Sequence, residues 1–312
     1  MIAMRFIIFF LLSLSLGATI MAFEVHENGT ITIDQITYPA VGFGTYPFQG
    51  QTCFLAVTEA AKLGYRLIDT ATYYENFEPI AKALKNFGRE NFYVISKAWP
   101  DSHHAKGLFA DIKSTLSQLQ TTYLDAYLLH WPNSACPIEE TLHAMRELCE
   151  KGLIRHIGLS NVTTNHLKRA LECAVSISWV QVEMHPYFCD MELLEFCKKN
   201  SITVQAWRPL DLGRISTDEV LTKIGQKYGK TACQVALRWI LQHGCIPIPG
   251  STNPVHMKEN LDSASFILST EDMQKIDSKA KNGQRFRLKL EHGLGFTDEF
   301  DFSYEQCWPK KL

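Results

Sequence analysis

Short apolar runs alternate with longer amphipathic stretches over most of this chain. Eight of the runs are rich in β-branched and aromatic residues, which is typical of buried strands. They cover residues 39–46, 65–71, 92–99, 124–132, 154–162, 178–187, 202–210 and 245–251. The stretches between them, for instance 52–64, 105–120, 138–152 and 165–174, repeat apolar residues at helical spacing. Strict alternation of strand and helix predicts a parallel sheet.

Eight strand and helix units favour a (β/α)8 barrel, the TIM-barrel fold of the α/β class. Such a barrel needs about 250 residues, and this chain of 312 residues is long enough for one with additions. The alternative is an open doubly wound sheet, but no Gly-x-Gly-x-x-Gly motif follows the first run. We therefore expect a single barrel domain over residues 23–312.

Several segments exceed the simple repeat. Residues 23–33 alternate around Asn28-Gly29, which predicts a two-stranded β-hairpin at the amino end of the domain. Helical spacing also covers Thr217–Tyr228 and Thr270–Lys281, which predicts two extra helices. Residues 283–312 lack periodicity but hold six large aromatic residues, so we expect a C-terminal loop that covers part of the barrel.

The first 22 residues have the layout of a secretory signal peptide. Arg5 precedes an apolar run from Phe6 to Leu16, and small residues lead to Ala22. The run is shorter than the ~20 apolar residues of a spanning helix. Nine scattered cysteines are instead typical of a reducing compartment, and Met21 is an alternative start. Export, to the periplasm or outside the cell, and a cytoplasmic protein starting at Met21 both stay open.

The charge distribution argues against one class of partner. The 31 Lys and Arg residues against 33 Asp and Glu residues give a net charge of -2, without long runs of one sign. Nucleic-acid binding requires a concentrated basic surface. We therefore expect a small-molecule partner and no nucleic acid. We also expect no membrane contact in the mature form and a monomer.

Four polar residues follow three consecutive predicted strands, where barrel enzymes place their active sites. They are Asp69, Tyr74, Lys97 and His130. A tyrosine hydroxyl with an ordinary pKa of about 10 is a weak acid, unless a nearby ammonium stabilises the phenolate. Lys97 can supply that ammonium, Asp69 can keep it charged, and His130 can orient a carbonyl oxygen. Each residue alone fits a structural role, but their convergence indicates proton transfer to a carbonyl.

Six blocks in consistent order resemble the aldo-keto reductase family. They are GYRLIDTATYY, VISKAW, LLHWP, HIGLSNV, VQVEMHPY and PGSTNPVHMKEN, and the similarity covers roughly residues 31–278. The resemblance implies NAD(P)H-dependent reduction of aldehydes or ketones in a (β/α)8 barrel. It also implies that Asp69, Tyr74, Lys97 and His130 form a catalytic tetrad, in which Tyr74 protonates the oxygen while hydride passes from nicotinamide to the carbonyl carbon.

The resemblance further implies the residues that contact NADP(H). Ser160, Asn161 and Gln181 would bind the nicotinamide carboxamide, which needs both donors and acceptors. Trp207 stands where the family places an aromatic ring, more often a tyrosine, against the nicotinamide. Arg208 would lie along the pyrophosphate or point to solvent. The other expected cofactor residues are Thr45, Asp69, Pro209, Leu210, Gly250, Ser251, Thr252, His256, Glu259 and Asn260.

This sequence departs from the family where NADPH-preferring members hold the 2'-phosphate. Those members carry a lysine and an arginine at the positions of Gly250 and His256. A histidine is mostly neutral at pH 7, so the phosphate loses its strongest partners. We therefore expect NAD(H) to be accepted as well as NADP(H).

Aromatic residues beside the tetrad suggest the substrate pocket. Tyr46, Trp99 and Trp131, together with His130, are expected to bind the substrate, and aromatic walls suit carbonyl compounds with apolar bodies. Ordinary rim packing is the alternative for each aromatic residue.

Three other functions compete with a reductase. A nucleotide-binding protein without catalysis is disfavoured by the complete tetrad. A metal-dependent hydrolase is disfavoured because no His-x-His ends the first strand, His103-His104 lies in a turn without partner ligands, and the cysteines lack zinc spacing. A secreted protein with a decayed cofactor site is the third. We expect no metal.

Overall fold

The computed structural model describes residues 23–133 and 136–281. Within these residues, eight parallel strands form one sheet whose order follows the chain. The Gly42 amide donates to the Pro247 carbonyl at 2.9 Å and the Gly44 amide donates to the Pro249 carbonyl at 3.3 Å, which joins the first strand to the last. The strands are β4 (Phe43–Gly44), β5 (Leu67–Asp69), β6 (Tyr93–Ala98), β7 (Leu124–Leu129), β8 (Ile154–Ser160), β9 (Trp179–Glu183), β10 (Thr203–Trp207) and β11 (Ile246–Pro247). The predicted barrel is confirmed, and the open sheet is excluded.

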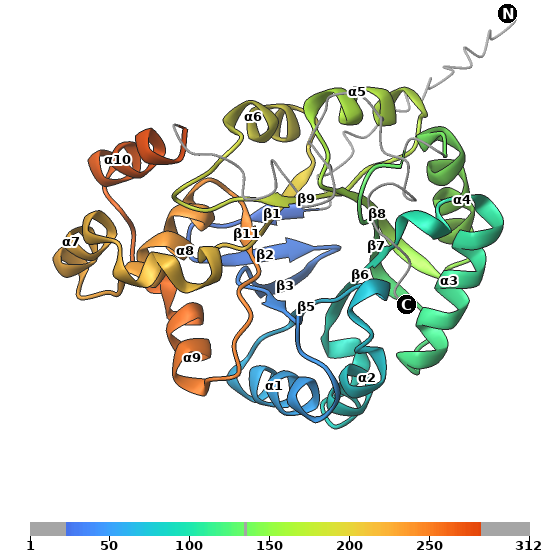
Figure 1. Cartoon of the computed structure of the whole chain (residues 1–312), viewed down its shortest axis with the longest axis horizontal. Helices are drawn as coiled ribbons and strands as arrows, with labels where there is room; N and C mark the ends of the chain where they lie inside the picture. Colours follow the sequence, from blue (N-terminus) through green and yellow to red (C-terminus); the bar gives the residue numbers. More distant parts are fainter. Residues whose placement is uncertain (1–22, 134–135, 282–312) are drawn as a thin grey trace, which may run out of the picture.

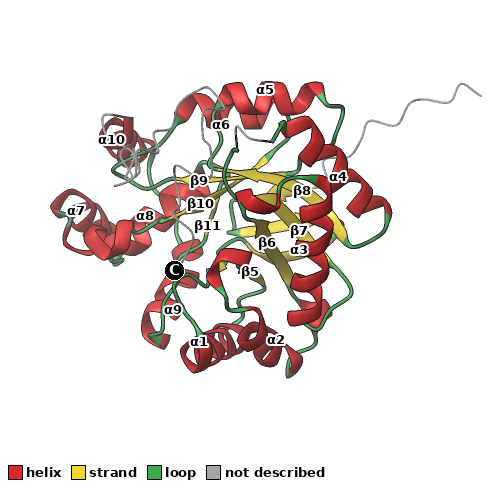
Figure 2. Ribbon diagram, turned by 45° about the vertical axis from the view of Figure 1, so that its right-hand side comes forward, coloured by secondary structure: helices red, strands yellow, loops and turns green. Residues whose placement is uncertain are grey.

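Helices surround the strands, as Figures 1 and 2 show. The helices that connect or follow the strands are α1 (Gly50–Leu63), α2 (Phe77–Lys85), α3 (Ala105–Gln118), α4 (Ile138–Glu150), α5 (Thr164–Glu172), α6 (Met191–Lys199), α8 (Ala232–Gln242) and α9 (Pro254–Asp262). Two further helices, α7 (Glu219–Tyr228) and α10 (Thr270–Lys281), confirm the predicted additions. Short 3-10 helices include η1 (Thr72–Tyr74), η3 (Pro100–Ser102) and η4 (Asp211–Thr217).

Local sequence explains where the elements begin and end. Every residue of β6 and β7 is buried, so their apolar runs are continuous rather than alternating, as in sheets covered on both faces. Helix α1 ends at Gly64, whose φ of 107° is left-handed and favours glycine. Helix α5 begins with a capping box, in which the Thr163 side chain accepts from the His166 amide and the His166 ring accepts from the Thr163 amide.

The predicted hairpin is confirmed and is longer than expected. Its two strands pair antiparallel, and a third strand continues the small sheet. The Phe23 ring meets the Trp179 ring edge-on at 5.1 Å between centroids. Trp179 begins β9, so the hairpin sheet packs near the amino ends of the barrel strands and leaves their carboxyl ends to the loops. Its strands are β1 (Phe23–Val25), β2 (Thr30–Ile33) and β3 (Ile36–Pro39).

Two expectations concern residues outside the described part of the chain. The predicted signal peptide at residues 1–22 and the aromatic C-terminal loop at 283–312 both lie there. Among the described helices, none combines the length and apolar character that crossing a membrane requires.

Candidate active site

A cleft of about 910 Å³ lies at the carboxyl ends of the barrel strands. Most of the residues predicted from the sequence line it. They are Tyr46, Asp69, Tyr74, Trp99, His130, Trp131, Asn161, Gln181, Trp207, Arg208, Pro209, Leu210, Gly250, Ser251, His256, Glu259 and Asn260. Four predicted residues are not part of the lining: Thr45, Lys97, Ser160 and Thr252. The first three are buried behind the wall, whereas Thr252 is exposed.

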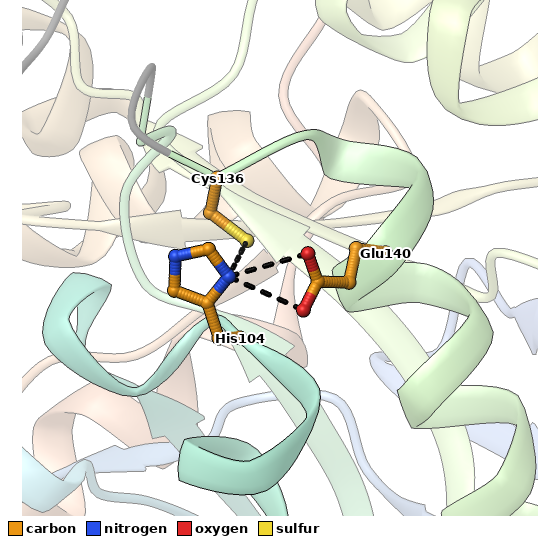
Figure 3. Close-up of side chains that lie close together, drawn as sticks. All are labelled: His104, Cys136 and Glu140. Atoms are coloured by element: carbon orange, nitrogen blue, oxygen red, sulfur yellow. Dashed lines mark hydrogen bonds and ion pairs between the residues drawn. The ribbon is translucent and has the colours of Figure 1, made fainter.

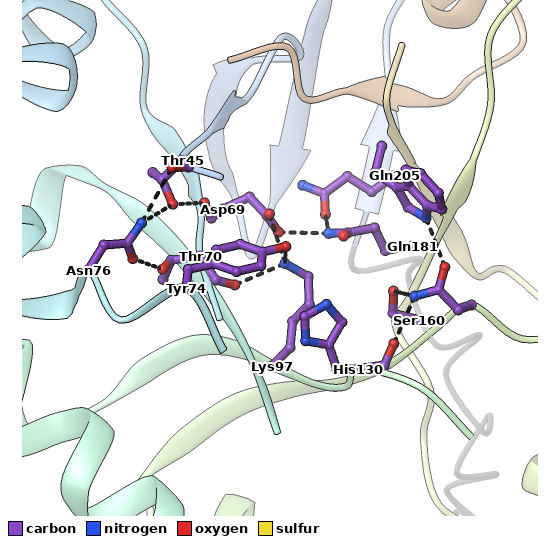
Figure 4. A network of polar contacts seen from close by, with 12 residues as sticks. Thr45, Asp69, Thr70, Tyr74, Asn76, Lys97, His130, Ser160, Gln181 and Gln205 are labelled. Carbon is purple, nitrogen blue, oxygen red and sulfur yellow. Dashed lines mark hydrogen bonds and ion pairs between the residues drawn. The ribbon is translucent and has the colours of Figure 1, made fainter. Parts of the chain in front are cut away.

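The four predicted catalytic residues meet at one point of the cleft wall. The Lys97 ammonium donates to the Asp69 carboxylate at 2.8 Å, to the Thr70 carbonyl at 2.9 Å and to the Tyr74 hydroxyl at 3.2 Å. The His130 ring lies edge-on to the Tyr74 ring at 5.7 Å between centroids. Figure 4 shows the end of the Lys97 side chain beside the Asp69 carboxylate and the Tyr74 hydroxyl, with His130 close by. An ammonium in contact with a tyrosine hydroxyl stabilises its phenolate form.

Burial strongly affects the ion pair that supports Tyr74. The side chain of Lys97 is fully buried, and that of Asp69 is 3% exposed. Burial raises the pKa of Asp69 and lowers the pKa of Lys97, while the attraction between the two charges opposes both shifts. The three partners of the Lys97 ammonium, all oxygen atoms, favour its charged form.

A buried amide network holds the second oxygen of Asp69. The Gln181 side-chain amide donates to that oxygen at 2.7 Å and to the Gln205 side-chain carbonyl at 2.6 Å. Both of its N–H groups therefore have partners, which leaves its own carbonyl oxygen available at the cleft. Sequence reasoning did not identify Gln205, although its alternation with Trp207 along β10 places it on the barrel interior.

A second network fixes the loop that carries Tyr74. Asn76 donates from its side-chain amide to the Thr45 hydroxyl at 3.1 Å and accepts from the Thr70 hydroxyl at 2.6 Å. Thr72, in η1, donates to the Asp111 carboxylate of α3 at 3.0 Å. Thr45 thus supports the loop from behind the wall, and Asn76 is a buried polar residue that the sequence analysis missed.

Asn161 links the histidine to the aromatic wall. Its side-chain amide donates to the His130 carbonyl at 2.8 Å and to the Ser160 hydroxyl at 3.1 Å, and its carbonyl accepts from the Trp207 indole at 3.0 Å. Its φ of 60° is left-handed, a conformation that asparagine tolerates better than most residues. The Trp207 ring is therefore held in a fixed orientation at the cleft.

The far end of the cleft is formed by the loop after β11 and by helix α9. Gly250, Ser251, His256, Glu259 and Asn260 line it. A Cβ atom added at Gly250 would lie 2.6 Å from the backbone oxygen of Gly44, so a side chain there requires the backbone to move. The absence of a lysine at this position therefore matches the close approach of the loop after β11 to strand β4.

Aromatic rings surround the opening beside the tetrad. Tyr46 packs against Tyr74 at 5.1 Å, and Trp99 meets His130 edge-on at 5.0 Å between centroids. The sequence analysis missed Tyr73, which stacks on Trp99 at 4.2 Å and lines the cleft. The tyrosine pair in the block GYRLIDTATYY was the available signal. It also missed other lining residues, among them Phe48, Leu212, Ser216 and Cys233.

Comparison with known proteins identifies the family. The model of the aldo/keto reductase family matches residues 40–281, and the chain belongs to that family. It is therefore an NAD(P)-dependent oxidoreductase that acts on carbonyl groups.

Individual relatives resemble the chain over most of its length. A glyoxal reductase of Bacillus subtilis is 39% identical over 251 residues, which cover 79% of this chain and 91% of the relative. The methylglyoxal reductase DkgA of Escherichia coli is 34% identical over 253 residues, with 79% and 91% covered. The solved structure of the aldose reductase from Schistosoma japonicum superposes with a TM-score of 0.77 at 30% identity, covering 82% of this chain and 93% of that one.

Proposed function

We propose that this protein reduces small aldehydes or ketones with NADPH or NADH and that Tyr74 is the general acid. The observation that carries the proposal is the contact of the buried Lys97 ammonium with the Tyr74 hydroxyl at 3.2 Å, at the wall of a large cleft. The similarity to glyoxal and methylglyoxal reductases adds small 2-oxoaldehydes to the compounds worth testing.

The residues along the cleft fit a nicotinamide dinucleotide. Gln181 keeps its side-chain carbonyl available beside Asp69, and the Trp207 ring is oriented by Asn161 for stacking. At the far end, Ser251, Glu259 and Asn260 offer polar atoms for the adenosine half. When bound, the reduced nicotinamide supplies the hydride.

The chain's own residues supply the proton and the orientation. The Tyr74 hydroxyl donates a proton to the substrate carbonyl oxygen, and Lys97 stabilises the phenolate that results. Asp69 holds the lysine in place and keeps it charged. The His130 ring, next to Tyr74, is placed to donate a hydrogen bond to the same oxygen. The aromatic rings beside Tyr74 offer an apolar wall to the body of the substrate.

The direct test is Tyr74→Phe, which removes one hydroxyl and keeps the ring. Because general acid catalysis contributes roughly 10²- to 10⁴-fold, we expect kcat to fall by at least about 100-fold. Cofactor affinity, measured by quenching of tryptophan fluorescence, should stay unchanged, because the hydroxyl acts on the substrate oxygen.

Tyr73→Phe is the matched control. Tyr73 is the neighbouring residue in η1, lines the same cleft and stacks on Trp99. The Tyr73→Phe variant keeps its ring, so its kcat should stay within a few-fold of the wild-type value. Wild-type turnover by the Tyr74→Phe variant would exclude Tyr74 as the acid.

A further inference from the structure

A second cluster of reactive side chains lies outside the tetrad. His104, Cys136 and Glu140 each present one possible metal-ligand atom, and these atoms all lie within 4.8 Å of one another. Figure 3 shows the three side chains converging, His104 from the start of α3, Cys136 from the segment before α4 and Glu140 from the first turn of α4. His104 lies in a bend before α3, as expected from the sequence, but the expectation that it has no partner ligands is wrong.

We propose that His104, Cys136 and Glu140 form a binding site for a divalent cation of the zinc class. An imidazole, a thiolate and a carboxylate are the three ligand types that Zn²⁺ uses in proteins. The residues are separated by 32 and 4 positions along the chain, so no ligand motif is visible in the sequence.

Two of the three separations between the ligand atoms match a tetrahedral site, and the third, from the Cys136 sulfur to a Glu140 oxygen, lies within 4.8 Å. Zinc binds sulfur at about 2.3 Å and nitrogen or oxygen at about 2.0 Å. Tetrahedral angles then separate a sulfur and a nitrogen ligand by roughly 3.5 Å, and a nitrogen and an oxygen ligand by roughly 3.3 Å. In the structure, the Cys136 sulfur lies 3.5 Å from Nδ1 of His104, and that nitrogen lies 3.2 Å from each Glu140 oxygen.

Neighbouring groups hold these ligands in position. The Ala105 amide donates to a Glu140 oxygen at 3.1 Å, which orients the carboxylate. The Cys136 sulfur lies 3.5 Å from the Thr141 hydroxyl, which in turn donates to the His103 carbonyl at 3.0 Å. Contacts of this kind fix the geometry of metal ligands and raise affinity.

The site is open to solvent on one side. The His104 side chain is 59% exposed and that of Glu140 is 40% exposed, whereas Cys136 is buried. Three protein ligands leave the fourth tetrahedral position for water. A cation can therefore enter from solvent and meet a sulfur atom at the inner end of the site.

A cation bound here joins two segments that reach the active-site cleft. His104 follows η3, which begins directly after Trp99, and Cys136 lies between β7 and α4 in the segment that contains Trp131. Both tryptophans line the cleft. A cation bound to His104, Cys136 and Glu140 would link these two loops of the substrate opening. The site is separate from the tetrad and from the proposed reduction.

The test is a titration of the reduced, metal-free protein with Zn²⁺, in competition with a chromophoric chelator. A parallel Cd²⁺ titration follows the ultraviolet charge-transfer band of a cadmium thiolate. We expect one saturable site in the wild type. Affinity should fall by more than about 10-fold in His104→Gln and in Cys136→Ser, and the thiolate band should disappear in Cys136→Ser.

Two matched controls separate this site from general binding. Cys149→Ser changes a half-buried thiol of α4, and His143→Gln changes an exposed histidine of the same helix. Both should bind Zn²⁺ like the wild type. Because His104 is exposed, its variant should fold even where the buried cysteine variant does not. Absence of saturable Zn²⁺ binding to the wild type, or unchanged affinity in His104→Gln, would overturn the proposal and leave the cluster a hydrogen-bonded helix cap.

Discussion

Replacement of Lys97 by methionine tests the buried ion pair that supports the tetrad. The change keeps a side chain of similar length but removes the ammonium and its bonds to Asp69, Thr70 and Tyr74. The Asp69 carboxylate, 3% exposed, then loses the charge that balances it. Because removal of one partner from a buried pair costs about 3 to 5 kcal/mol, we expect the free energy of unfolding at neutral pH to fall by that amount.

The cost should depend on pH. Burial raises the pKa of Asp69, and the variant lacks the ion pair that opposes this rise. A carboxyl with a folded pKa above its unfolded value contributes stability at low pH, and that contribution is lost as the pH rises through the folded pKa. The difference between variant and wild type should therefore shrink as the pH is lowered from neutrality.

Urea unfolding followed by circular dichroism measures both effects. With a slope of roughly 3 kcal/mol per molar urea, a loss of about 4 kcal/mol lowers the midpoint by more than about 1 M. Lys275→Met is the control, because Lys275 makes an exposed pair with Glu271 on α10, and its midpoint should not move. Equal stability of Lys97→Met and wild type at neutral pH would refute the claim that Asp69 and Lys97 form a charged ion pair on which the folded state depends.

Two further substitutions test the cofactor half of the cleft. His256→Arg places a permanent charge at the expected 2'-phosphate end and should raise the affinity for NADPH relative to NADH by roughly 10-fold, about 1.4 kcal/mol; an unchanged affinity ratio in fluorescence titrations would contradict this. Gly250→Lys should not add to that gain, because its Cβ would meet the Gly44 oxygen at 2.6 Å, and a larger gain in the double variant would show that the loop after β11 moves easily away from β4. Trp207→Phe keeps an aromatic face but loses the indole bond to Asn161, so both cofactor affinities should fall by a few-fold, and unchanged affinities would exclude a role for that bond.

The strand ends were predictable because the barrel topology follows from the alternation of strands and helices. Once the parallel strands close into a barrel, the residues at the carboxyl ends of successive strands must lie at the same end of that barrel. That reasoning anticipated the meeting of Asp69, Lys97 and His130, which the structure places together with Tyr74. Their chemical roles stay predictions until the variants are measured.

Contacts and short elements that depend on how the loops run could not be predicted from the alternation of strands and helices. The third hairpin strand was missed because Ile36–Pro39 is short and Pro39 was assigned to the following run. Leu212 and Ser216 line the cleft from η4, which has no periodic pattern. Cys136 and His104 meet only because two loops run side by side, and no spacing rule connects positions so far apart in the sequence.

The central claim is that this cleft binds a reduced nicotinamide cofactor and reduces a carbonyl beside Tyr74. The most direct measurement is a titration of residues 23–312 with NADPH and NADH by tryptophan quenching, followed by a panel of aldehydes and ketones that includes glyoxal and methylglyoxal. The account predicts saturable binding of at least one cofactor and its oxidation when a carbonyl compound is added. Failure to bind either cofactor would contradict it.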